Sequence, residues 1–138
     1  MSTDLDTTKN QGKWPYSDLE IRNLETKERY RQTYLPERIK LFQKAIVTHD
    51  PRAVIFYSSG SEYREAWSNV CGGKFEEFPI NNGPKIRHHY GKRTHFFVIP
   101  HPTARLKGLT SAYWGEVGIL VKKLTKTEVV RQTKIEQP

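Results

Sequence analysis

The sequence is short of cysteine and of long apolar runs, and each shortage excludes a class of protein. Cys71 is the single cysteine, so an internal disulfide scaffold is excluded. The longest apolar runs, Ala53–Tyr57 and Phe96–Ile99, are far shorter than the roughly 20 residues that span a bilayer. Residues Met1–Asp6 have neither the basic start nor the apolar stretch of a secretory signal. The sequence therefore predicts a cytoplasmic protein that does not interact with a membrane.

Acidic side chains are too few to balance the basic ones. Lys and Arg total 23 against 15 Asp and Glu, which gives a formal net charge of +8. The pI is accordingly near 9.6. An excess of this size suits a polyanionic partner, most often nucleic acid. A solvated basic surface with no partner explains the same charge, and charge alone does not separate the two.

Length and composition favour one domain with polar ends. A chain of 138 residues fits one ordinary domain, and 12% aromatic residues supply the material of a core. The mean hydropathy of −0.75 is low for a fully packed chain. We therefore expect a polar tail over 1–13, a domain over 14–124 and a basic polar tail over 125–138.

Residue patterns along the chain predict an α/β architecture. Apolar β-branched runs indicate buried strands, and apolar residues at helical spacing indicate helices. Pro36 is placed at the first turn of a second helix, where its missing N–H costs little. The expected strands are 53–57, 75–79 and 93–99, and residues 85–90 form either a hairpin with 93–99 or a loop that leads into it. The expected helices are 27–34, 36–49, 62–70 and 112–124. The implied fold is a small, mainly parallel sheet flanked by helices.

Two loops follow the strands expected to be buried, where ligands bind in open parallel sheets. The first contains Ser58, Ser59 and Ser61. The second, Pro100–Ser111, holds His101 between two prolines that restrict its backbone. We take these three serines as candidate DNA contacts.

The remaining candidates lie further along the second loop. Thr103 supplies a small hydroxyl group, and Arg105 and Lys107 can contact phosphates. Leu106 can act as an apolar wedge between bases. An exposed polar loop with no ligand is the alternative interpretation of the same residues.

The run Val98–Arg105, followed by Tyr113-Trp114, resembles the last motif of the uracil-DNA glycosylase superfamily. That motif is a strand, then His-Pro-Ser or a close variant, then a loop that enters the minor groove. Pro51–Tyr57 is similar to the superfamily strand before the central helix, and Trp14 to Ile39 is similar to a bacterial branch. The resemblance covers most of 14–124 and implies the carboxyl-terminal portion of such a domain.

The resemblance implies a role for each matching residue. His101 would hydrogen-bond a flipped pyrimidine and stabilise the leaving base, and Thr103 would help grip a phosphate. Arg105 and Leu106 would support the phosphate or wedge contacts. Such chemistry requires a base extruded from the stack, so the implied partner is DNA.

The first superfamily motif, a Gly-rich loop that supplies the water-activating residue, has no counterpart before Trp14. Three possibilities therefore stay open: a DNA glycosylase, a catalytically inactive DNA-binding relative, and an incomplete domain. In the third, a partner chain or self-association completes an exposed sheet edge.

Histidines suggest a competing metal site. A turn at Gly91-Lys92 would place His88 opposite His95 across the hairpin, and facing residues can share a metal ion. The sequence offers no further metal ligand at a supporting spacing. It also lacks the cysteine set of an iron–sulfur cluster and the Gly-rich pattern that binds nucleotides. We therefore expect no metal and no cofactor.

Overall fold

The computed structural model describes residues 14, 16–58 and 60–135. These residues form two compact units that divide between His49 and Asp50. The expected tail over 1–13 lies outside the described residues. No helix in the described part is long and apolar enough to cross a membrane.

The first unit is a helix with an aromatic cluster at its beginning. Helix α1 covers Lys27–His49, and its first turn is capped by Thr26, whose hydroxyl accepts a hydrogen bond from the Arg29 N–H at 3.0 Å. A short 3₁₀ helix, η2 (Ser17–Leu19), precedes it. The buried Trp14 packs on Tyr30, with ring centroids 5.7 Å apart.

The expected break before Pro36 is wrong, because α1 runs through it as one helix. Proline removes one hydrogen bond to the carbonyl four residues earlier, that of Gln32. Both residues are exposed, so water can solvate that carbonyl and the helix continues.

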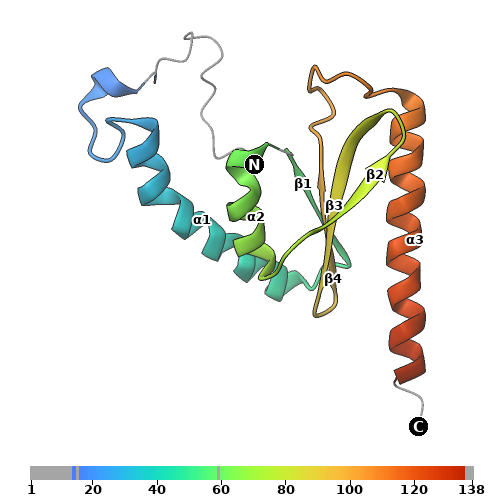
Figure 1. Ribbon diagram of the computed structural model, residues 1–138. Helices are drawn as coiled ribbons and strands as arrows, with labels where there is room; N and C mark the ends of the chain where they lie inside the picture. The colour runs from blue at the N-terminus through green and yellow to red at the C-terminus, as the bar shows by residue number, and fades with distance from the viewer. Residues whose placement is uncertain (1–13, 15, 59, 136–138) are drawn as a thin grey trace. The chain divides into compact units, whose positions relative to one another are not determined.

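The second unit is a four-stranded mixed sheet with a helix on each face (Figure 1). The strands are β1 (Ala53–Tyr57), β2 (Glu76–Ile80), β3 (Gly83–Gly91) and β4 (Thr94–Ile99). Their order is β1-β4-β3-β2; β1 and β4 are parallel, whereas the other two pairs are antiparallel. The α/β class is therefore confirmed, but the expectation of a mainly parallel sheet is wrong. The direction of each strand is fixed by the connections between strands, here the hairpin β3–β4 and the turn β2–β3. Strand composition alone does not predict it.

The helices of this unit are α2 (Arg64–Cys71), which follows the 3₁₀ helix η3 (Ser61–Tyr63), and α3 (Ser111–Ile135). Gly72 ends α2 in the left-handed conformation at φ 73°. The Thr110 hydroxyl accepts a hydrogen bond from the Tyr113 N–H at 3.2 Å and so caps α3. Helix α3 continues to Ile135, past the expected end at Leu124.

The core lies between α3 and one face of the sheet. Alternate residues of β3 and β4 point to this face, where Ile86, Phe97 and Ile99 pack against Tyr113 and Val117 of α3. Phe97 and Ile86 have no exposed surface, which indicates close packing at the centre of the sheet.

Strand β1 is less buried than its composition indicates. It lies at the edge of the sheet, pairs only with β4, and leaves Ile55 43% and Tyr57 53% exposed. The expected burial of both faces is therefore wrong for β1 and correct for β4, whose residues are all buried. The partner chain that we expected at an exposed sheet edge stays a prediction.

Candidate functional site at the carboxyl ends of β1 and β4

The two predicted loops meet at one end of the sheet. Because β1 and β4 are parallel and Tyr57 pairs with Ile99, their carboxyl ends lie next to each other. The Ser58 N–H donates to the Ile99 carbonyl at 3.1 Å and extends this pairing by one step. The structure thus places the start of the loop after β1 beside the start of the loop after β4.

His101 stands at the exposed end of β4, directly after the fully buried Pro100. Its Nδ1 accepts the backbone N–H of Thr103 at 3.2 Å, and Nδ1 lies 2.8 Å from the Thr103 hydroxyl oxygen. A nitrogen that accepts an N–H carries no hydrogen itself, so the neutral ring holds its proton on Nε2. The Tyr57 ring lies edge-on at 6.1 Å between centroids. The site therefore presents an imidazole N–H donor with a fixed tautomer.

The rest of the loop after β4 is stabilised by short-range bonds and by one glycine. The Ala104 N–H donates to the His101 carbonyl at 2.9 Å, which closes a tight turn. Gly108 has φ 93°, and a Cβ there would meet the Asn82 carbonyl oxygen. This close approach ties the end of the loop to the β2–β3 turn.

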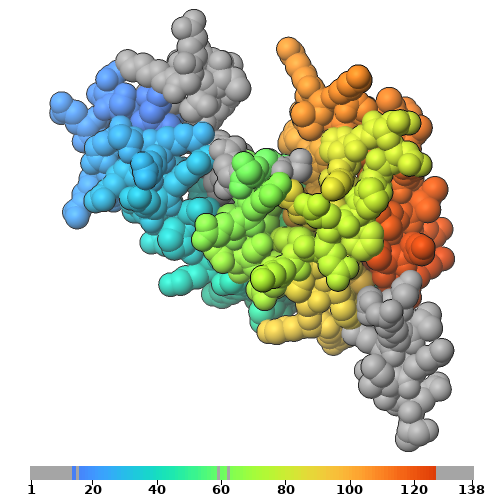
Figure 2. Space-filling model, in the orientation of Figure 1, coloured from blue at the N-terminus to red at the C-terminus, as the bar shows by residue number. Residues whose placement is uncertain are grey.

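Between these two anchors, the loop exposes its cations and one apolar side chain. Arg105 and Lys107 are exposed, and Leu106 between them is 48% exposed. The segment, orange in Figure 2, protrudes at the surface of the second unit. This is the arrangement that phosphate contacts and an apolar wedge require.

The serine loop begins beside the histidine loop, and its role as a DNA contact stays a prediction. The Ser58 carbonyl accepts a hydrogen bond from Trp67 Nε1 at 3.1 Å, and Ser58 has φ 149°, an unusual value for a residue with a side chain. Ser61 is exposed at the start of η3. Ser59 lies outside the described residues. In the described part of the chain, no hydrogen bond joins the hydroxyl of Ser58 or Ser61 to His101.

The described residues provide His101 with no carboxylate partner. Among the described residues, no Asp or Glu side chain forms a hydrogen bond or ion pair with His101 or Thr103. The hydrogen bonds of the described residues therefore identify no general base beside His101.

The histidine pair of the hairpin is buried and lies elsewhere. His88 Nε2 and His95 Nδ1 are 3.0 Å apart on the α3 face, where one nitrogen donates to the other. Burial, together with the charge that His95 or His89 would carry, lowers the pKa of His88 to about 4. His89 points to the opposite face, where it contacts the Lys74 carbonyl at 2.9 Å. In the described chain, no three His, Cys, Asp or Glu residues form a group that could hold a metal ion.

Sequence reasoning missed a pocket on the α2 face of the sheet. Arg64, Trp67 and Ser68 recur on one side of α2, and this spacing was the available signal. Arg87 faces them from β3.

Comparison with protein-family models, curated proteins and solved structures finds no match to this chain. The resemblance to the uracil-DNA glycosylase superfamily therefore rests on the motif residues alone.

Proposed function

We propose that this protein is uracil-DNA glycosylase-like and binds a flipped pyrimidine in DNA, with His101 as the donor to the base. The observation that carries the proposal is the acceptor role of His101 Nδ1 toward Thr103. It places the hydrogen of the neutral tautomer on Nε2, and a pyrimidine carbonyl can accept a hydrogen bond from such a group. The same bond would stabilise negative charge on a departing base.

The groups around His101 suit an opened DNA strand. Arg105 and Lys107 are exposed cations on the same loop, and none of the described residues forms an ion pair with either. They are therefore available to phosphates without breaking an existing bridge. Leu106 is positioned between them to fill the space that an extruded base leaves.

The test is an excision assay on end-labelled single-stranded and duplex oligonucleotides that contain one uracil, developed with alkali. We expect cleavage by the full chain that is lost in His101→Ala and kept in His49→Ala, an exposed histidine of α1. Excision unaffected by His101→Ala would contradict the assigned role.

A second candidate, DNA binding without excision, is favoured by the lack of a described carboxylate at His101. In that case the oligonucleotide stays intact while the protein still binds it. The logarithm of the binding constant should then fall linearly with the logarithm of the salt concentration, with a slope of roughly −0.9 per phosphate contacted on duplex DNA. Flat salt dependence would contradict both candidates.

A further inference from the structure

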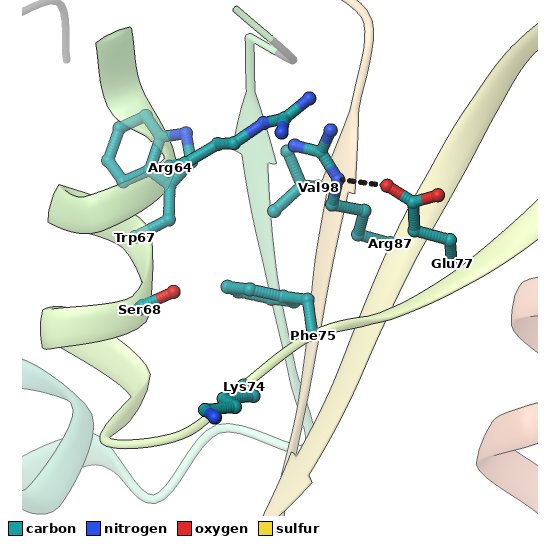
Figure 3. Close-up of a pocket in the computed structure, with 8 residues that line it drawn as sticks. All are labelled: Arg64, Trp67, Ser68, Lys74, Phe75, Glu77, Arg87 and Val98. Atoms are coloured by element: carbon teal, nitrogen blue, oxygen red, sulfur yellow. Dashed lines mark hydrogen bonds and ion pairs between the residues drawn. The ribbon is translucent and has the colours of Figure 1, made fainter. Parts of the chain in front are cut away.

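A pocket of about 290 Å³ opens on the sheet face that α2 covers (Figure 3). It lies wholly within the second unit, between α2 and strands β2, β3 and β4. Its lining includes Arg64, Trp67, Phe75, Glu77, Arg87 and Val98.

Strand register explains why a charged group faces this pocket. Glu77 pairs with Arg87 across β2 and β3, and Arg87 pairs with Val98 across β3 and β4. Paired residues point to the same face, so this row places a guanidinium beside an apolar strand. The Arg87 side chain is only 16% exposed, which removes much of its hydration.

Positive charge exceeds negative charge at the pocket. Glu77 is the one carboxylate of the lining, and it is shared by Lys85 at 3.5 Å and Arg87 at 3.4 Å. Bonds to Lys85 first, and then to Arg87, hold the pKa of Glu77 below its usual range. Arg64 extends toward Arg87 in Figure 3, so two guanidinium groups converge on the opening. Guanidinium groups donate paired N–H bonds to phosphate oxygens, so such a pair suits an anionic ligand.

The remaining walls are flat and rigid. The Phe75 ring and Val98 form apolar surface inside the pocket. Trp67 stacks on Phe56, with centroids 4.5 Å apart, and its Nε1 is held by the Ser58 carbonyl. These contacts fix the indole as a wall and leave apolar surface suited to a planar ring.

We infer that this pocket binds a small phosphate monoester that carries a planar ring, of the size and chemistry of a nucleoside 5′-monophosphate. The phosphate lies between the guanidinium groups of Arg64 and Arg87, whose paired N–H donors match its oxygens. The ring lies against Phe75. The lining of the pocket includes none of the residues assigned to DNA binding, so the inference holds or fails separately from the proposed function.

Isothermal titration of the full chain with three probes tests this: uridine 5′-monophosphate, uridine, and inorganic phosphate. The monophosphate should bind saturably. Uridine and inorganic phosphate should each bind at least about tenfold more weakly, because the first contacts only the apolar walls and the second only the guanidinium groups. Equal affinity for inorganic phosphate would overturn the assignment of a ring, and equal affinity for uridine would overturn that of the anion.

Variants then locate the binding. Arg64→Gln, at an exposed position, and Arg87→Gln should each weaken monophosphate binding about tenfold, the loss expected when a charge-assisted hydrogen bond is removed. Arg93→Gln is the matched control, because Arg93 is 76% exposed and pairs with Asp50 outside the pocket. Undiminished binding in Arg64→Gln, or no monophosphate binding to the unaltered chain, would overturn the inference.

Discussion

The buried histidine pair makes the stability of this protein sensitive to mild acid. The pKa of His88 is lowered from the ordinary value of 6.5 to about 4, chiefly by burial and then by the charge of His95. Between these two values the unfolded chain binds a proton that the folded chain does not. Lowering the pH through this window therefore favours unfolding, and the stabilisation is fully present only above about pH 6.5.

The gap between the two pKa values corresponds to about 3 kcal/mol of unfolding free energy. His88→Gln tests this, because an amide can keep a hydrogen bond to His95 Nδ1 without titrating. Urea unfolding followed by circular dichroism at pH 7.5 and at pH 4 gives the decrease in unfolding free energy for each protein. The variant should lose about 3 kcal/mol less than the unaltered chain over this range.

His49→Gln is the matched control, since His49 is exposed on α1. Its pH dependence should follow that of the unaltered chain. If His88→Gln also loses stability in parallel with the unaltered chain, the argument from the buried pair is refuted.

Three further outcomes follow from the packing of the second unit. Gly108→Ala should lower the free energy of unfolding by about 2–4 kcal/mol in thermal unfolding, because φ is 93° and a Cβ would meet the Asn82 carbonyl. Gly115→Ala, with open space around it, should instead stabilise α3 by about 1 kcal/mol. Similar effects of the two substitutions would contradict the loop geometry. Tyr113→Phe should cost about 1 kcal/mol in urea unfolding, since its hydroxyl donates to a β3 carbonyl at 2.8 Å, and an unchanged midpoint would show that this bond contributes nothing. Burial raises the pKa of the Cys71 thiol, so maleimide labelling at pH 7.5 should be slower in the folded chain than in urea, and equal rates would contradict the burial.

Local patterns predicted the elements of the second unit well. The run 53–57 and the hairpin residues up to Ile99 became strands where expected, and Gly72 ended α2. These features depend on neighbouring residues along the chain, through β-propensity and left-handed backbone at glycine. Strand direction depends on connections between elements, so the mixed sheet did not follow from the same patterns.

The candidate site was partly predictable for the same reason. The sequence indicated His101 and Thr103 as neighbours after a strand, and the structure adds the hydrogen bond from the Thr103 N–H to Nδ1, which indicates the tautomer. The pocket on the α2 face depends on cross-strand register, which pairs Glu77 with Arg87 and Arg87 with Val98. Register is a tertiary property, so no local pattern revealed that row.

The central claim, base recognition by His101, is tested most directly by one comparison of affinities. Fluorescence anisotropy would measure binding to two single-stranded oligonucleotides that differ at one position, uracil in one and an abasic analogue in the other. The difference isolates the base, because the phosphates are the same in both.

The unaltered chain should prefer the uracil strand by roughly three- to tenfold, the contribution of one hydrogen bond. His101→Ala should lose this preference while it keeps the affinity that both strands share. Equal binding of the two strands by the unaltered chain, or a preference that survives His101→Ala, would contradict the account.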